Sequence, residues 1–215
     1  MTKYFILLGP PGAGKGTQAK RLAQRLGYFY FGMGDLLRDE AKKGTALGQK
    51  IQAIWDKGQG ELVGEELIEE FIEQKINQIK SQKGIVFDGV PRTLKQAEKI
   101  ENFIGNINQN LKVINLEANN DLLIKRIQTR KVCPQCGRIF FQPERLGIKK
   151  CYCGGELIQR DEDKADVFQK RLAVYYEQTK PLIDNYQNKG ILINIDGNPT
   201  IEAVWQKILE ILDFK

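Results

Sequence analysis

The feature of this 215-residue chain that most constrains its fold is a glycine-rich segment, residues 9–17, which reads Gly-Pro-Pro-Gly-Ala-Gly-Lys-Gly-Thr. It follows a short apolar run and opens a segment with helical periodicity, so the pattern predicts a strand, a tight turn and a helix. Backbone N–H groups of such a turn and the positive end of the helix bind phosphate, and Lys15 can reach the outer phosphates. The segment therefore predicts a nucleotide site.

One departure from the general phosphate-binding loop is informative. That loop has Ser or Thr directly after its lysine, whereas here Gly16 stands between Lys15 and Thr17. The order favours a specialised nucleotide-binding loop over a generic ATPase loop. A glycine turn that binds no ligand is the alternative.

Short apolar runs recur along the chain and alternate with amphipathic segments. The runs predict strands at 4–8, 84–88, 112–117 and 191–195, with a weaker fifth strand at 28–31. Helical patterns cover 15–26, 65–80, 94–104, 120–130, 164–187 and 200–212, with Pro181 bending or interrupting the fifth helix. This alternation predicts an α/β fold in which a parallel five-stranded sheet has helices on both faces.

Two segments do not fit the alternation and are expected to be insertions at the ligand end of the sheet. Residues 32–63 are helical and punctuated by glycines, and residues 129–163 contain every cysteine of the chain. The expected organisation is a core domain formed by 1–31, 64–128 and 164–215, with the two insertions covering it.

The four cysteines form two close pairs, Cys133-Pro-Gln-Cys136 and Cys151-Tyr-Cys153. Paired spacing of this kind is typical of a tetrahedral zinc site with thiolate ligands. Such a zinc would be structural, because four thiolates leave no position for a reactive water. Disulfides are the competing interpretation, which a reducing compartment disfavours. The second pair is one residue short, so either of its cysteines could be a strained ligand.

The charge of the chain suits an anionic ligand. Thirty-three basic and 27 acidic residues give a net charge of +6, which fits either nucleic acid or a small polyanionic substrate. The chain has no histidine, so the commonest general acid or base is missing. Phosphoryl transfer fits this composition because it depends on positioning and electrostatic stabilisation.

No apolar run is long enough for a membrane span, so the expected location is the cytoplasm.

Several arginines are placed where phosphates would bind. Arg126 and Arg130 are spaced to share one face of the predicted helix, and Arg160 and Arg171 flank the end of the cysteine segment. Each of them could instead be a solvated surface residue. Asp88 ends a predicted strand, where a carboxylate would hold Mg²⁺ through water, although Asp also commonly starts turns.

Together these motifs resemble the adenylate kinases, specifically the type with a zinc site in its lid. The resemblance covers nearly the whole chain: the glycine loop with Gln18, Gly-Asp-Leu-Leu-Arg at 34–38, Asp-Gly-Val-Pro-Arg-Thr at 88–93 with Gln96, Arg-Ile-Gln-Thr-Arg-Lys at 126–131, the cysteine segment, and Arg-Asp-Glu-Asp at 160–163 followed by Arg171.

The resemblance implies reversible transfer of a phosphoryl group from MgATP to AMP, giving two ADP, by a cytoplasmic monomer that binds neither nucleic acid nor membranes. It implies ATP binding by Gly12, Ala13, Gly14, Lys15, Gly16, Thr17, Arg126, Arg130, Ile139, Phe140 and Asn198. It implies AMP binding by Met33, Arg38, Glu61, Leu62, Val63, Gly89, Val90, Pro91, Arg92, Gln96, Arg160 and Arg171. The implied catalytic residues are Lys15, Arg92, Arg126, Arg160 and Arg171. The cofactors are Mg²⁺ near Asp88 and Zn²⁺ on Cys133, Cys136, Cys151 and Cys153.

The chain departs from the family pattern around the AMP pocket. It has Gly32-Met33 where the family usually has Ser-Thr, so a hydroxyl beside the AMP base is missing, and it has Val90 where an aromatic residue is usual. A two-residue insertion lies near Gln59. Thr93 and Gln96 still favour AMP over pyrimidine monophosphates. The remaining alternatives are a kinase for another nucleoside monophosphate and a nucleic-acid-binding NTPase with a zinc ribbon.

Overall fold

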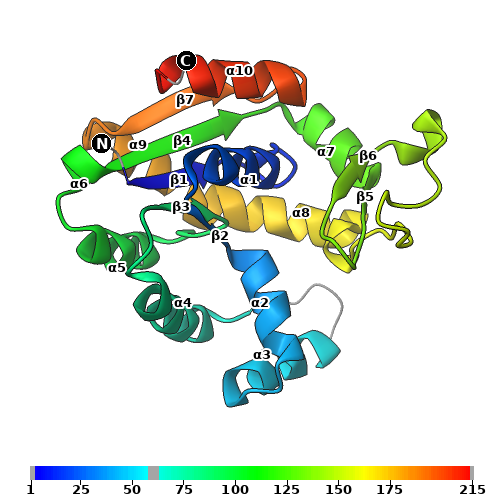
Figure 1. The fold of residues 1–215 in the computed structure, drawn as a ribbon, viewed down its shortest axis with the longest axis horizontal. Coiled ribbons are helices and arrows are strands. Elements are labelled where there is room, and N and C mark those ends of the chain that lie inside the picture. The colour runs from blue at the N-terminus through cyan, green and yellow to red at the C-terminus, as the bar shows by residue number, and fades with distance from the viewer. Residues whose placement is uncertain (1–2, 58–62, 214–215) are drawn as a thin grey trace.

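A five-stranded parallel sheet forms the centre of the protein in the computed structural model, which describes residues 3–57 and 63–213. The strand order is β2-β3-β1-β4-β7 (Figure 1). The strands are β1 Tyr4–Leu8, β2 Phe29–Gly32, β3 Ile85–Asp88, β4 Leu111–Glu117 and β7 Leu192–Asp196. The predicted α/β fold and the five parallel strands are confirmed, with strand boundaries displaced by no more than one residue.

The two faces of β1 pack into two separate cores. Ile6 and Leu8 join one core with residues of α4, α5 and α9, and Phe5 and Leu7 join the other with residues of α1, α7, α8 and α10. Successive side chains of a strand point to opposite faces, so a continuous apolar run indicates burial on both sides. Figure 1 accordingly shows α4 and α5 on one side of the strands and α10 on the other. The helices of the two layers are α1 Lys15–Leu26, α4 Glu65–Ile79, α5 Leu94–Ile104, α7 Asn120–Gln128, α8 Ala165–Val174, α9 Pro181–Asn188 and α10 Ile201–Ile211.

The long helix expected at 164–187 is interrupted. After α8 the chain forms a π-helical segment, η3 Tyr175–Thr179, and α9 then begins at Pro181. Proline has no N–H to donate and is favoured in the first turn of a helix, which explains the new start. The interruption at Pro181 was predicted, but the π-helical segment was not, and neither was the short helix α6 Ile107–Asn110.

Both expected insertions form structures outside the main sheet. The first contains α2 Met33–Lys42 and α3 Ala46–Lys57, which lie below the sheet in Figure 1. The second contains an antiparallel pair, β5 Arg130–Val132 and β6 Ile139–Phe141, and two short 3₁₀ helices, η1 Pro143–Leu146 and η2 Asp161–Asp163. Across residues 3–57 and 63–213, no helix combines the length and the apolar character that crossing a membrane requires.

The parallel register brings the carboxyl ends of three strands together. Asp88, the last residue of β3, lies opposite Leu7 on one side and Gly32 on the other. The glycine loop leaves β1 at the same edge, and Gly9 approaches β4 so closely that a Cβ there would overlap the Leu116 carbonyl oxygen. Because ligands of open parallel sheets bind beyond the carboxyl ends of the strands, this edge is where the site is expected.

Candidate functional site

The glycine loop joins β1 to α1 with its lysine folded over it. The Lys15 Nζ donates to the carbonyl oxygens of Gly9 at 2.7 Å and Pro10 at 2.8 Å. Gly12 and Gly14 have φ values of 88° and 96°, a conformation that side chains other than glycine rarely adopt. Gly14 is also the residue that precedes α1, so no side chain caps the first N–H groups of the helix. These are the requirements of a phosphate-binding loop.

Burial controls the charge of Lys15. Removal from water, with a smaller contribution from the positive charges of Arg171 and Arg92, lowers the pKa of this ammonium group to about 7, while Asp88 acts in the opposite direction. An anionic ligand beside the loop would restore the charged form, since an opposite charge favours it.

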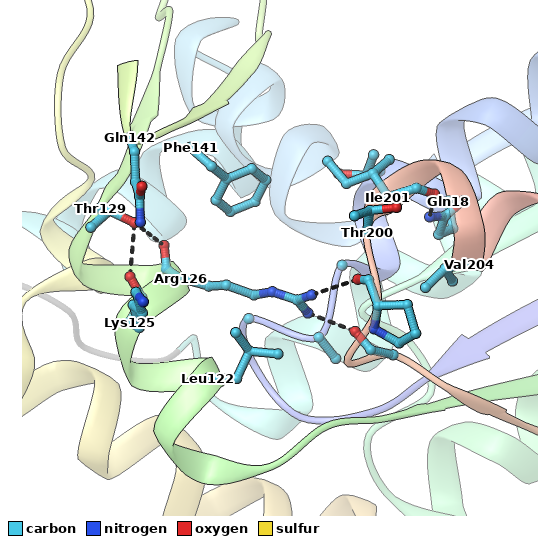
Figure 2. Close-up of a pocket in the computed structure, with 16 residues that line it drawn as sticks. Gln18, Leu122, Lys125, Arg126, Thr129, Phe141, Gln142, Thr200, Ile201 and Val204 are labelled. Carbon is cyan, nitrogen blue, oxygen red and sulfur yellow. Dashed lines mark hydrogen bonds between the residues drawn. The ribbon is translucent and has the colours of Figure 1, made fainter. Parts of the chain in front are cut away.

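A cavity of about 340 Å³ lies on one side of the glycine loop (Figure 2). Its walls come from α7, from the segment that leads into α10, and from the end of β6. Figure 2 shows the Phe141 ring on one side of the Arg126 side chain, with Thr200 and Ile201 across the cavity. The Arg126 guanidinium donates to three consecutive carbonyl oxygens, those of Gly197 at 2.8 Å, Asn198 at 3.1 Å and Pro199 at 3.0 Å.

The hairpin strand β6 presents alternate residues to the site. Ile139 and Phe141 line the cleft beside the loop, whereas Phe140 is 8% exposed and packs with Cys133 and Cys151 on the other face. From the sequence, Phe140 was expected to contact the nucleotide, and Phe141 was not. In this structure Phe141 lines the cleft and Phe140 faces away from it, because neighbouring side chains on a strand point to opposite faces.

A second cleft, of about 200 Å³, lies on the other side of the loop and gathers six of the predicted cations. They are Lys15, Arg38, Arg92, Arg130, Arg160 and Arg171. They come from the core and from both inserted segments, so the fold brings together residues up to 156 positions apart, from Lys15 to Arg171. Planar guanidinium groups bind phosphate oxygens through paired hydrogen bonds, which makes the cleft suitable for polyphosphate.

Arg130 and Arg126 do not share a helix face, and that expectation was wrong. Helix α7 ends at Gln128, and Arg130 is the first residue of β5. Arg130 points into the second cleft and pairs with both carboxylate oxygens of Asp163, with Nε to Oδ2 at 2.8 Å. Thr129 ends the helix with a 2.8 Å hydrogen bond from its hydroxyl to the carbonyl oxygen of Lys125.

An acid that was not predicted from the sequence, Glu162, lies inside the arginine cluster. Glu162 lies 3.2 Å from Arg160 and 3.7 Å from Arg38, and its carbonyl oxygen accepts from Arg171 at 3.0 Å. Burial alone would raise the pKa of Glu162, but Arg171, Arg38 and Arg160 together lower it to about 2. Glu162 therefore stays ionised and links the second inserted segment to the first. It lies within the motif quoted for its arginine, Arg160, which is the signal that could have identified it.

Asp88 is held by a residue that the sequence analysis also missed. The Tyr30 hydroxyl donates to the Asp88 Oδ2 at 2.8 Å, and burial together with the charges of Asp88 and Asp35 raises the pKa of Tyr30. The same carboxylate oxygen would lie 3.0 Å from a Cβ at position 16. Gly16 therefore allows the loop and Asp88 to come together. A carboxylate oxygen at this place is the kind of ligand that Mg²⁺ prefers.

The turn after Asp88 holds Arg92 over the second cleft. Arg92 Nε donates to the Gly89 carbonyl oxygen at 2.9 Å, its backbone N–H donates to the Gln96 side chain at 2.8 Å, and its carbonyl oxygen accepts from Thr179 at 3.1 Å. Gly89 and Pro91 line the cleft beside it, and the peptide bond before Pro91 is cis.

The other described residues expected around AMP do not line the second cleft. The solvent-exposed fractions of Met33, Val90 and Gln96 are 2%, 1% and 4%, and Val63 is half-buried against the core that contains Met33 and Val90. Glu61 and Leu62 lie outside the described residues.

The four cysteines meet in the second inserted segment. Their Sγ atoms all lie within 4.8 Å of one another, with Cys133 to Cys153 at 3.5 Å and Cys136 to Cys151 at 3.4 Å. A disulfide needs about 2.05 Å, whereas four sulfurs at about 2.3 Å from a zinc ion would be about 3.8 Å apart. The donor set therefore fits tetrahedral zinc, and the short Cys151-Tyr-Cys153 pair reaches the site as well as the longer one.

The surroundings of the cluster are equally constrained. The backbone turns back after each pair, with the N–H of Gly137 donating to the Cys133 carbonyl oxygen at 2.9 Å and that of Gly154 to the Cys151 carbonyl oxygen at 2.8 Å. A Cβ at Gly155 would lie 2.7 Å from the Cys133 Sγ, so only glycine leaves room for this sulfur.

Comparison with known proteins identifies the family of the chain. A family model described as Adenylate kinase matches residues 7–191. The adenylate kinase of Archaeoglobus fulgidus is 42% identical over 213 residues, covering 97% of each chain. That of Methanocella arvoryzae is 43% identical over 204 residues, covering 93% of this chain and 94% of its own. That of Thermodesulfovibrio yellowstonii is 40% identical over 215 residues, covering 98% and 99%. Since these matches span the glycine loop, the arginine cluster and both inserted segments, the chain belongs to the adenylate kinase family.

Proposed function

We propose that the two cavities are the donor and acceptor halves of one site, in which the enzyme transfers a phosphoryl group between MgATP and AMP. The phosphotransfer itself follows from membership of the family. The base and ribose of ATP would occupy the cavity of Figure 2 between Arg126 and Phe141, and the ATP phosphates would lie on the loop Gly12 to Thr17. AMP would bind in the second cleft, with its phosphate on Arg38 and Arg92.

The chemistry requires little beyond charge and position. Lys15, Arg92, Arg160 and Arg171 surround the cleft between the two phosphate positions and would stabilise the charge on the transferring phosphoryl group. A phosphate oxygen of AMP is already anionic, so the acceptor needs no strong general base, in keeping with a chain that has no histidine.

The inserted segments have distinct proposed roles. Residues 32–63 form the AMP-binding insertion and residues 129–163 form the lid, both outside a core of 1–31, 64–128 and 164–215. Arg38 comes from the first segment and Arg160 from the second, and both lie beside Glu162. With both segments packed over the bound nucleotides, the site would exclude water, which would otherwise compete with AMP as the acceptor.

Two metals complete the proposal. Asp88 would hold Mg²⁺ through water, and the ion would offset the negative charge of the ATP phosphates. Cys133, Cys136, Cys151 and Cys153 would hold zinc, which would stabilise the lid and take no part in the reaction, because four thiolates fill its coordination sphere.

The observation that carries the assignment is the convergence of Lys15 and five arginines on one cleft beside the glycine loop. In an assay coupled to ADP formation, AMP should raise turnover by orders of magnitude over ATP alone. A panel of AMP, CMP, UMP and GMP should give the highest kcat/KM with AMP. Turnover that does not respond to AMP, or that prefers another monophosphate, would reject the assignment.

We also expect the enzyme to be a cytoplasmic monomer that interconverts adenine nucleotides and binds no nucleic acid. The positive charge also fits a nucleic-acid-binding NTPase with a zinc ribbon, but three arginines of the second cleft, Arg38, Arg160 and Arg130, already pair with Asp35, Glu162 and Asp163. Binding of DNA or RNA that weakens steeply with salt would favour that alternative.

The hairpin offers a matched pair of substitutions for the donor cavity. Replacing Phe141 by alanine should raise KM for ATP about tenfold with a smaller change in kcat, because the ring would contact the bound base or ribose in ground state and transition state alike. Replacing Phe140 by alanine should lower the melting temperature and leave KM for ATP nearly unchanged, because its ring packs with Cys133 and Cys151. Steady-state kinetics and thermal melts of both variants measure the contrast. An equal rise in KM in both would contradict the orientation of β6.

A further inference from the structure

A tyrosine occupies the wall of the second cleft at the point where the strands β2 and β3 end. Tyr30 lies in β2, its ring faces the Lys20 ammonium at 5.2 Å, and its hydroxyl donates to Asp88 Oδ2 at 2.8 Å. Both Tyr30 and Asp88 line the cleft that contains Lys15. The tyrosine therefore reaches the edge of the site, where its hydroxyl engages the carboxylate that the proposed function assigns to magnesium.

The backbone beneath this ring is fitted to it. A Cβ at Gly32 would overlap the Tyr30 Cε1, Cζ and hydroxyl oxygen, so the ring fills the space that a side chain at position 32 would take. Gly32 is also the β2 residue paired with Asp88. The Tyr30 hydroxyl can reach the carboxylate across the strands only because position 32 has no side chain. This gives a physical reason for Gly32 that the sequence alone did not provide.

The phosphate loop lies against the same carboxylate oxygen that accepts from Tyr30. A Cβ at Gly16 would lie 3.0 Å from Asp88 Oδ2 and 3.8 Å from the Tyr30 hydroxyl oxygen. Two glycines from different segments thus leave room for one hydrogen bond. The arrangement restricts Asp88 to an orientation against the loop, which a carboxylate on a flexible side chain would not otherwise keep.

We propose that Tyr30 is a positioning residue for the metal-dependent step: with Gly32 beneath it, its hydroxyl holds the Asp88 carboxylate against the phosphate loop, where it can bind the Mg²⁺ of MgATP through water. The inference rests on the proposed function, because Asp88 has this role only if MgATP binds at the loop. Groups that orient a metal-binding carboxylate commonly change metal affinity about 10-fold to 100-fold when removed.

Replacing Tyr30 by phenylalanine keeps the ring and removes only the hydrogen bond. Calorimetric titration with a non-hydrolysable ATP analogue should show about tenfold weaker binding in the presence of Mg²⁺, and affinity within twofold of the parent protein in EDTA. The Mg²⁺ concentration for half-maximal turnover should rise by a similar factor. Tyr4→Phe is the matched control, since Tyr4 begins β1 at the other end of the sheet and packs against Phe103. It should change neither quantity.

A double-mutant cycle separates positioning from packing. In the Asp88→Asn background, Tyr30→Phe should change binding in Mg²⁺ by less than twofold, because the carboxylate through which it acts is gone. Equal losses in Mg²⁺ and in EDTA, or the same loss in the Asp88→Asn background, would show that Tyr30 only supports the wall of the cleft. The calorimetric titration needs no AMP. An enzyme that binds MgATP as expected but fails to use AMP would therefore reject the proposed function and leave the inference intact.

The fit between Tyr30 and Gly32 gives an independent test. Gly32→Ser should lower the melting temperature clearly in the parent protein, because the new Cβ and the ring cannot share the space. In a Tyr30→Ala background the same substitution should lower it much less. Equal losses in the two backgrounds would contradict the arrangement of the ring over Gly32.

Discussion

Replacing Lys15 by methionine is expected to lower kcat/KM more than a hundredfold while the protein stays folded. The Lys15 side chain lies over the glycine loop, next to Asp88 and the arginines of the second cleft, where the charge of the transferring phosphoryl group would develop. Losing one such electrostatic contact costs roughly 3 kcal/mol or more of transition-state stabilisation, which corresponds to the expected loss of rate. Methionine keeps most of the length of the side chain, so the packing of the loop should change little.

The proton balance of nucleotide binding provides a second measurement on the same residue. Because the pKa of Lys15 is lowered to about 7, the amine is largely neutral at pH 8 in the free enzyme and largely charged below pH 6. Phosphates beside it raise this pKa, so binding of MgATP at pH 8 should take up a proton, and binding near pH 6 should take up much less through this group. Calorimetry in buffers of different ionisation enthalpy measures the uptake.

The control for this residue is Lys207→Met, since Lys207 lies on α10 and pairs with the exposed Glu210. It should keep both the activity and the proton uptake of the parent protein. Lys15→Met should lose the uptake. A Lys15→Met enzyme with near-normal turnover, or with unchanged uptake at pH 8, would contradict the role assigned to the lysine.

Most of the core could be predicted because its signals are local and long. The run at residues 4–8 is apolar on both strand faces, and the glycine turn after it permits only a few backbone conformations. Apolar runs recur at the other strands, more weakly at β2, and their alternation with helical segments predicts a parallel sheet covered on both faces. The π-helical segment at 175–179 left no such pattern, because it differs from an α-helix only in that its backbone hydrogen bonds span five residues in place of four.

Only part of the candidate site could be predicted from the sequence. The arginines were predicted because the motifs fix their positions in the sequence, but their environment was not. Whether Phe140 or Phe141 faces the nucleotide depends on the register of a three-residue strand, too short to show periodicity. The partners Tyr30 and Glu162 depend on contacts between segments far apart in the chain, such as Tyr30 and Asp88, which are 58 positions apart. Arg130 was expected in the same helix as Arg126, but α7 ends at Gln128 and Arg130 begins β5.

Removing zinc is expected to lower the melting temperature by at least about 5 °C, the equivalent of roughly 2 kcal/mol for a chain of this size. The lid has little apolar core of its own: Cys133, Phe140 and Cys151 are its buried apolar cluster, with Ile148 and Leu157 packed against them. Without the metal, four thiols within 4.8 Å of one another would no longer be held together, and the segment would lose the contact that organises it. Turnover at low temperature should change little, because none of the four cysteines lines either cavity.

The test compares the protein as purified with protein treated with a zinc chelator and then returned to magnesium buffer. Metal analysis should give one zinc per chain before treatment. Cys136→Ser should melt at the lower temperature and should no longer respond to the chelator. Tyr152→Ser, a change between two ligands at a side chain that is 73% exposed, should keep its zinc and most of its stability. An apoprotein that melts like the zinc form would show that the lid is held by its ion pairs, such as Arg130 with Asp163, and that the four sulfurs are not a structural metal centre.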